Sequence, residues 1–88
     1  MAKLKVYGFR GWRTGLVKNP NGSPQTREIV ATTSKKKVLE ILGPIHHMPL
    51  SEIEETGNDG EISQAMTEPG IVFFCGIDEP KPKWRRVP

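Results

Sequence analysis

The chain has 88 residues, a formal net charge of +3 and 35% hydrophobic residues, which predicts one domain, residues 1–88, near the lower size limit for independent folding. Its single cysteine, Cys75, excludes an internal disulfide and any zinc site built from several cysteines. No apolar run approaches the roughly 20 residues of a membrane span or resembles a signal peptide, so we expect a cytoplasmic protein without membrane contact.

The first predicted element is a strand from Lys3 to Trp12 or Arg13. Apolar and polar residues alternate along its first half, as on a strand whose two faces differ in burial. Gly8 and Gly11 interrupt the alternation, and glycines inside a strand are typical of a bulge or a twisted edge. The following residues, 15–25, are rich in glycine, proline and asparagine, which predicts a long hairpin loop.

The most informative stretch is Arg27–Gly43, with the sequence REIVATTSKKKVLEILG. Its first part, up to Thr33, is β-branched and alternating, which predicts a second strand. Its second part predicts a helix, because apolar residues recur at helical spacing at Val38, Ile41 and Leu42. A hydroxyl of Thr33 or Ser34 can cap the start of this helix, and Gly43 can end it in the left-handed conformation.

Two shorter helices are predicted in the second half of the chain. Ser51 opens a capping-box pattern, which favours a short helix over residues 51–55. Asn58 or Asp59 can cap another, whose apolar positions follow helical spacing at Ile62, Ala65 and Met66.

Two further strands are predicted near the end of the chain. Residues 71–75, IVFFC, are apolar on both faces, which is typical of a strand in the middle of a sheet. Cys75 is therefore expected to be buried and unreactive. Residues 84–87 are predicted to form a short last strand, with Trp84 packing inward and Arg85 exposed.

This order of elements predicts an α+β fold. We expect a small antiparallel or mixed sheet of three to four strands, with one main helix and one or two short helices on one face. The expected core residues are Ile29, Ala31, Val38, Ile41, Leu42, Ile71 and Phe73. A homodimer is one ordinary way for such a small core to gain stability, so a monomer and a homodimer both remain open.

Three short patterns spell out catalytic or metal chemistry, and each has a simpler explanation. Ser34 to Lys37 reads S-x-x-K, but a helix cap explains the serine without the larger domain that serine catalysis needs. His46 and His47 are adjacent, so their side chains diverge rather than converge on a metal. The acidic residues 52–61 lack the spacing of a calcium loop. We therefore expect no enzyme activity, no cofactor and no metal site.

The charge is unevenly distributed along the chain. Residues 1–47 carry nine Lys or Arg and two Glu, whereas residues 48–88 carry four Lys or Arg and eight Asp or Glu. Such an arrangement can steer a charged partner, or it can simply provide two solvated faces.

Basic and aromatic residues alternate at three places, which we call the basic–aromatic set: Arg10, Trp12, Arg13, Lys35, Lys36, Lys37, Trp84, Arg85 and Arg86. These residues are the binding candidates, because cations meet phosphates and aromatic rings stack on bases. The simpler alternative is that both tryptophans belong to the core or its rim, with long basic side chains beside them.

Five short motifs are R-x-I-V-A-x-x-S-K-K-K at residues 27–37, L-G at 42–43, E-T-G-N at 55–58, E-I-x-x-A at 61–65 and P-G-I-V-F at 69–73. Together they resemble a group of short uncharacterised bacteriophage and prophage proteins. The group has no activity to carry over, but small phage proteins of this size often bind host proteins. Together with the lack of a catalytic set and the uneven charge, the resemblance leads us to expect a non-catalytic accessory protein in the host cytoplasm that binds and inhibits a host protein, in a nucleic-acid-processing or anti-phage defence complex. The alternative is a nucleic-acid-binding module that uses the basic–aromatic set.

Overall fold

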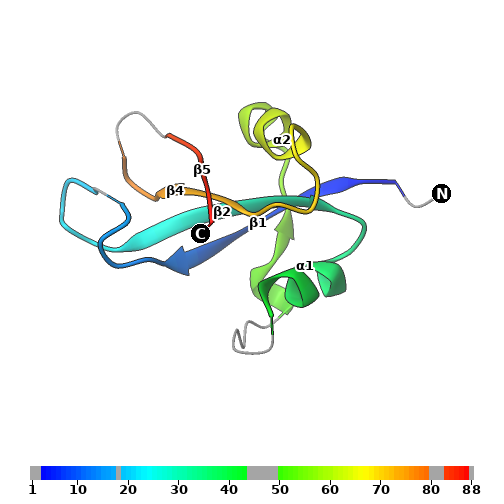
Figure 1. Cartoon of the computed structure of the whole chain (residues 1–88), viewed down its shortest axis with the longest axis horizontal. Coiled ribbons are helices and arrows are strands. Elements are labelled where there is room, and N and C mark those ends of the chain that lie inside the picture. Colours follow the sequence, from blue (N-terminus) through cyan, green and yellow to red (C-terminus); the bar gives the residue numbers. More distant parts are fainter. Residues whose placement is uncertain (1–2, 18, 44–49, 80–82, 88) are drawn as a thin grey trace.

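The computed structural model describes residues 3–17, 19–43, 50–79 and 83–87. These residues contain one five-stranded antiparallel sheet with the strand order β3-β1-β2-β4-β5 (Figure 1). Its strands are β1 (Lys5–Trp12), β2 (Gln25–Thr32), β3 (Glu54–Glu55), β4 (Phe73–Gly76) and β5 (Arg85–Arg86). The α+β class is confirmed, and the sheet has more strands than the three to four expected.

Two α-helices follow the sequence signals closely: α1 (Lys35–Leu42) and α2 (Asp59–Met66). The Ser34 hydroxyl accepts the Lys37 N–H and the Asn58 side chain accepts the Glu61 N–H, so each helix begins at a predicted cap. Gly43 ends α1 with φ at 91° and an extended ψ, which is a glycine conformation outside the left-handed helical region. No helix in the described part of the chain is long and apolar enough to cross a membrane.

The centre of the sheet is the long hairpin of β1 and β2. Its register runs without interruption from Lys5 opposite Thr32 to Trp12 opposite Gln25. Of the two interpretations of Gly8 and Gly11, a bulge or a twisted edge, the bulge is therefore wrong. Both glycines instead leave room for polar side chains of β2, because a Cβ atom on Gly8 would collide with the Arg27 guanidinium and one on Gly11 with the Glu28 carboxylate.

The two helices lie on opposite faces of the sheet, with α1 below it and α2 above it in Figure 1. The α1 face buries Tyr7, Phe9, Val30, Val38, Ile53 and Val72. The α2 face buries Val6, Ile29, Ala31, Ala65 and Phe73. The prediction of helices on one face is wrong because β2 is apolar on both sides, so each side needs a cover.

The segment between the helices contains an edge strand that the sequence did not indicate. The predicted helix over residues 51–55 is instead a 3-10 turn, η1 (Leu50–Glu52), followed by β3. The Thr56 N–H donates to the Val6 carbonyl at 2.9 Å, which continues the pairing with β1. Burial of Ile53 on the α1 face explains this geometry, because the chain must leave the turn to place that side chain under the sheet.

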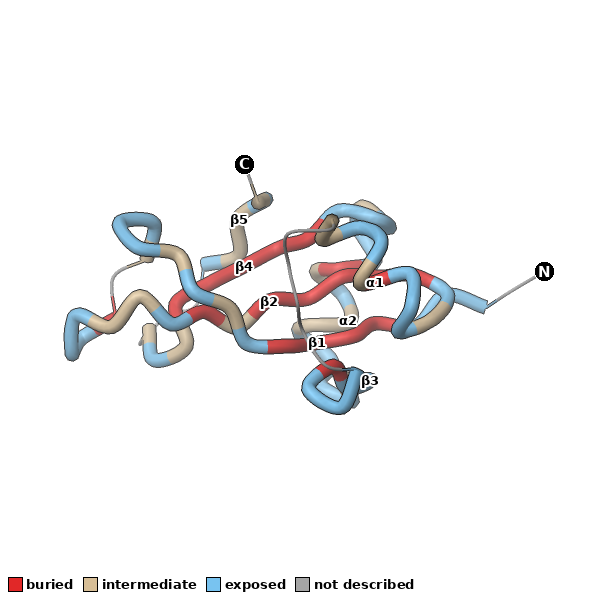
Figure 2. Tube along the Cα trace, turned by 90° about the horizontal axis from the view of Figure 1, so that it is seen from below, coloured by how far each residue is buried: buried red, intermediate tan, exposed pale blue. Residues whose placement is uncertain are grey.

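Burial corrects part of the expected core. Ile29, Ala31, Val38 and Phe73 are buried as expected, and Leu42 is half-buried. Ile41 is 38% exposed and Ile71 is 40% exposed, so both expectations were wrong. Figure 2 shows that burial is nearly continuous along β2 and β4, each of which pairs with a neighbouring strand on both sides.

Candidate binding surface

The structure separates the basic–aromatic set into two regions. The end of β1 and the strand β5 lie on either side of the ring of Phe74, which Arg13 and Arg85 both contact. The lysines at the start of α1 lie at the other end of the hairpin, because Thr32 pairs with Lys5. The eight residues of β1 span roughly 23 Å, so the two regions do not form one continuous patch.

Arg13 is held by a buried carboxylate. Its Nε donates to Glu28 Oε2 at 2.7 Å and its Nη2 donates to Oε1 at 2.9 Å, while the Thr26 hydroxyl donates to Oε2 at 2.6 Å. Glu28 is 2% exposed, so the bidentate pair satisfies a charge that burial would otherwise destabilise. Arg13 therefore serves the fold, and its charge is already neutralised.

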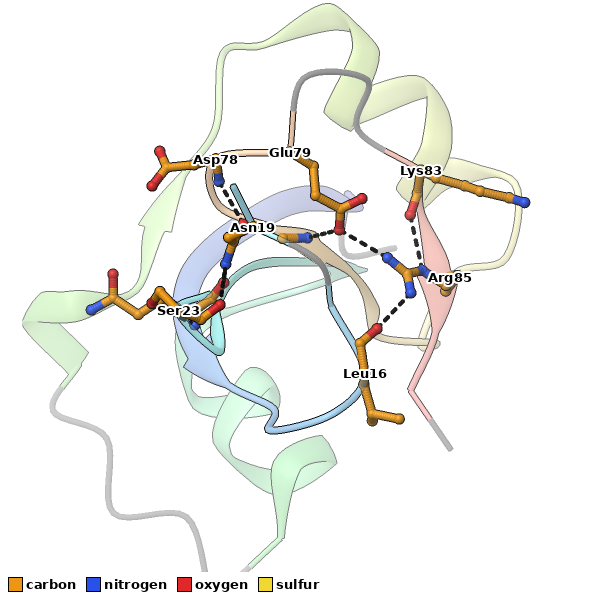
Figure 3. A network of polar contacts seen from close by, with 9 residues as sticks. Leu16, Asn19, Ser23, Asp78, Glu79, Lys83 and Arg85 are labelled. Atoms are coloured by element: carbon orange, nitrogen blue, oxygen red, sulfur yellow. Dashed lines mark hydrogen bonds and ion pairs between the residues drawn. The ribbon is translucent and has the colours of Figure 1, made fainter. Parts of the chain in front are cut away.

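Arg85 of β5 is also held by a carboxylate of its own chain and also contacts Phe74. The Arg13 and Arg85 guanidinium carbons lie 5.3 and 5.2 Å from the centre of the Phe74 ring, within the range of a cation–π contact. Arg85 also donates to the Glu79 carboxylate at 2.9 Å and to the Leu16 carbonyl at 2.5 Å, as Figure 3 shows. The prediction that Arg85 is exposed is therefore wrong, since it is half-buried.

Asn19 anchors this end of the molecule, and no sequence pattern identified it. Its amide nitrogen donates to the Ser23 and Gln25 carbonyls at 2.6 and 2.9 Å, and its amide oxygen accepts the Asp78 N–H at 2.9 Å (Figure 3). The side chain thereby joins the β1–β2 loop to the turn after β4. An asparagine before a proline indicates a turn, but such a local signal cannot reveal a contact 59 residues away.

Arg27 and Glu61 form a second bidentate pair on the α2 face. The two Arg27–Glu61 hydrogen bonds are 2.9 and 3.1 Å long, and the Thr56 hydroxyl donates to Glu61 at 2.6 Å. Burial raises the pKa of Glu61, but the hydrogen bonds from Arg27 and Thr56 outweigh it, so the net pKa lies below the ordinary value. The hydrogen bond to Glu61 raises the pKa of Arg27, and the pair stays ionised.

Three other members of the basic–aromatic set also contact their own chain. Trp84 is half-buried against the α2-face core, which agrees with its predicted inward packing. Arg86 is paired with Glu68, and Lys37 lies 3.0 Å from Glu40. In the described part of the chain, no buried side-chain nitrogen or oxygen lacks a hydrogen-bond partner.

The remaining members are exposed: Arg10, Trp12, Lys35 and Lys36. Among the residues that the structure describes, the three cations form no ion pair. Trp12 is 66% exposed, more than any other large hydrophobic residue described. Arg10 and Trp12 are therefore exposed neighbours on the same face of β1, where a binding partner can contact both.

Two hollows adjoin the end of β1. The first, of about 550 Å³, lies between β1 and the η1–β3 segment and is lined by Gly8, Phe9, Arg10, Arg27, Glu52 and Glu54. The second, of about 290 Å³, is lined by Phe9, Arg10, Gly11, Trp12, Arg13, Glu28 and Leu42. We call the first the Arg10 hollow. Its lining mixes cations and carboxylates and presents no nucleophile.

Cys75 is the free thiol of the chain, and it is 3% exposed. Burial, together with the nearby Glu79 and Glu61 charges, raises its pKa to about 11. The described residues include no group of three or more His, Cys, Asp or Glu side chains that could hold a metal ion. His46 and His47, the other metal candidates in the sequence, lie outside the described residues.

Comparisons of the chain with protein-family models, with curated proteins and with solved structures found no match.

Proposed function

We propose that this protein is a small non-catalytic accessory protein of the phage type that binds a host protein and inhibits it, in a complex that processes nucleic acid or defends against phage. One observation carries the preference for a protein partner: Arg13, Arg85 and Arg86 are paired with carboxylates of their own chain. Trp12, by contrast, is an exposed aromatic side chain of the kind that is enriched at protein interfaces.

The alternative of a nucleic-acid-binding module depends on the cations that remain. Arg10 lies toward one end of β1 and Lys35 and Lys36 at the start of α1, so they do not line one backbone-tracking groove. Phosphate binding by Arg13, Arg85 or Arg86 would have to compete with carboxylates that they already contact. A protein partner avoids this competition.

The test is an affinity purification from host lysate with and without nuclease, followed by binding of the purified partner to the chain. A host protein should remain bound after nuclease treatment, and titrating the chain should lower the activity of that partner. A matched variant, Lys35→Glu/Lys36→Glu/Lys37→Glu, reverses the lysine cluster and should leave partner binding within a few-fold of wild type if it depends on apolar contacts.

The nucleic-acid alternative predicts the opposite behaviour. Contacts with about five phosphates would give a log–log salt dependence of the binding constant with a slope near −4 to −5 on duplex DNA. The triple lysine variant would then lose retention on DNA. Tight DNA binding with this slope at physiological salt, and no host protein bound after nuclease treatment, would contradict the proposed function.

A further inference from the structure

The outer edge of β1 extends beyond its cover. Backbone groups of alternate residues in a strand point to opposite sides, and the Val6 carbonyl accepts the Thr56 N–H on the β3 side. The Arg13 N–H donates to the Pro24 carbonyl on the β2 side. The even-numbered residues of β1 therefore direct their N–H and C=O groups toward the outer edge, and these residues include Arg10 and Trp12.

β3 pairs with Tyr7 and Gly8 of β1 and with no later residue. Figure 2 shows it beside part of β1, while the rest of the strand continues along the rim of the sheet. Among the described residues, no backbone group bonds to the N–H or C=O of Arg10 or Trp12. Such an edge is a template for another strand, and proteins usually block it.

The side chains at this edge complement each other. Arg10 and Trp12 are two positions apart, so both side chains lie on the α2 face. The Arg10 hollow lies beside one, and the exposed Trp12 ring projects from the other. When two copies of the chain are related by a two-fold rotation, the aromatic ring of each copy can lie in the hollow beside the cation of the other.

We propose that the outer edge of β1 pairs with the same edge of a second copy of this chain, antiparallel, with Gly11 of each copy at the two-fold axis. In this register Arg10 lies opposite Trp12 of the other copy, and Trp12 opposite its Arg10. Both are hydrogen-bonded pairs, because the even-numbered residues carry the edge-facing backbone groups. The two sheets thereby join into one.

The register explains three features together. Each Trp12 ring enters the Arg10 hollow of the other copy and faces a cation, which is an attractive arrangement on both sides of the axis. Gly11 lies at a non-hydrogen-bonded position, where strands approach most closely and no side chain intervenes. Pairing also covers the exposed Trp12 ring of each copy, and an isologous interface needs this kind of self-complementarity.

A second copy fits this edge better than an arbitrary strand of another protein. An unrelated strand needs side chains suited to Arg10 and to Trp12 at matching positions, whereas the chain itself supplies both in the required order. The overlap is short, because Gly8 already pairs with Glu54. A short interface implies a weak dimer that forms with increasing concentration.

The test is the mass in solution, by sedimentation velocity, from about 10 µM to about 1 mM protein, the range expected for weak association. Wild-type protein should shift from monomer to dimer across this range. Trp12→Ala should weaken dimerisation roughly tenfold, since two cation–π contacts are lost per dimer. Lys36→Ala, an exposed cation at the far end of the hairpin, is the matched control and should leave dimerisation unchanged.

The register itself is tested by charge exchange. Trp12→Lys places two like-charged pairs across the axis and should prevent dimerisation at about 1 mM. The double variant Arg10→Glu/Trp12→Lys replaces them with two ion pairs and should restore dimerisation. Both positions are exposed, so the variants should keep the far-UV circular dichroism spectrum of the wild type.

Three results would overturn the proposal: a wild-type monomer at about 1 mM protein, a dimer that Trp12→Ala does not weaken, or a double variant that stays monomeric. A monomeric chain whose Trp12→Ala variant loses a host protein would instead assign this edge to that partner. The dimer does not depend on the proposed function, because these measurements use the purified chain alone.

Discussion

At the scale of single residues, two glycines of β1 leave room for charged side chains that extend from the neighbouring strand β2. Gly8 admits the Arg27 guanidinium on the α2 face, and Gly11 admits the Glu28 carboxylate on the α1 face. In each case the glycine belongs to β1 and the charged side chain to β2. A buried charge is tolerated there because the missing Cβ leaves room for its hydrogen-bonding partners.

This arrangement makes Gly11 sensitive to a single added carbon. A Cβ atom in Gly11→Ala would collide with Glu28 Oε2 and Thr26 Oγ1, so the buried carboxylate must move away from Arg13. We expect a loss of about 2–3 kcal/mol of unfolding free energy, measured by urea denaturation. Gly57→Ala is the control, because no atom lies within 4 Å of its Cβ position. Equal stability of both variants would contradict this account.

Cys75 provides a second prediction at the residue scale. A pKa near 11 leaves about 0.1% thiolate at pH 8, and the sulfur is buried. A thiol reagent should therefore label the native protein at least a hundredfold more slowly than the urea-unfolded chain. Prompt labelling of the native protein, at the rate of a free cysteine, would show that β4 opens readily.

The Arg27–Glu61 pair makes stability depend on pH. The pKa of Glu61 is lower in the folded chain than its ordinary value of 4.5, so the folded state binds fewer protons than the unfolded state. Its contribution is present above pH 4.5 and is lost as pH falls through the folded pKa. Glu61→Gln should cost about 1–2 kcal/mol at pH 7 and flatten the stability profile below pH 4.5. A parallel profile in both proteins would exclude this assignment.

At the scale of elements, local sequence patterns predicted the bounds of the strands and helices better than they predicted which face of each element is buried. The β2–α1 unit begins and ends within two residues of its predicted bounds, because capping and periodicity are local properties. The side of α1 that packs most deeply depends on the rest of the fold, so local sequence could not predict it. Val38 contacts the α1-face core, whereas Ile41 at the same helical spacing is more than one third exposed.

Two apolar residues of α1, one buried and one exposed, can therefore be compared by mutation. Val38→Ala should cost about 2 kcal/mol and lower the melting temperature by roughly 8–16 °C, because the side chain is fully buried. Ile41→Ala should cost less than about 1 kcal/mol, since much of that side chain already meets solvent. Thermal melts of the two variants decide the question, and a larger loss for Ile41→Ala would reverse the assigned packing.

The candidate binding surface was less predictable than the fold. Arg13 lies 15 residues from Glu28, and Arg86 lies 18 residues from Glu68. No spacing rule marks such pairs, because they depend on strand register and on helix placement across the sheet. The sequence therefore indicated a larger basic surface than the folded chain presents. Trp12 and Arg10 remained exposed because their face of β1 extends beyond α2 and β3.

For the whole molecule, folding partly offsets the uneven charge of the sequence. Basic residues of the first half pair with acidic residues of the second in Lys5–Glu55 and Arg27–Glu61. Arg85 and Arg86 pair with second-half carboxylates. Some of the opposite charges of the two halves thus form ion pairs that join the elements. Fewer charges are left to steer a distant partner.

Because β2 contributes side chains to the apolar layers on both faces of the sheet, we expect the molecule to unfold in one cooperative transition. The two apolar layers lie on opposite faces, but β2 contributes Val30 to one and Ile29 to the other, so neither layer persists when β2 is lost. In a Trp12→Phe background, Trp84 fluorescence reports the α2 layer. Adding Val38→Ala, which perturbs the α1 layer, should lower the Trp84 transition by the same amount as the far-UV circular dichroism transition. An unshifted Trp84 transition would mean that the layers unfold independently.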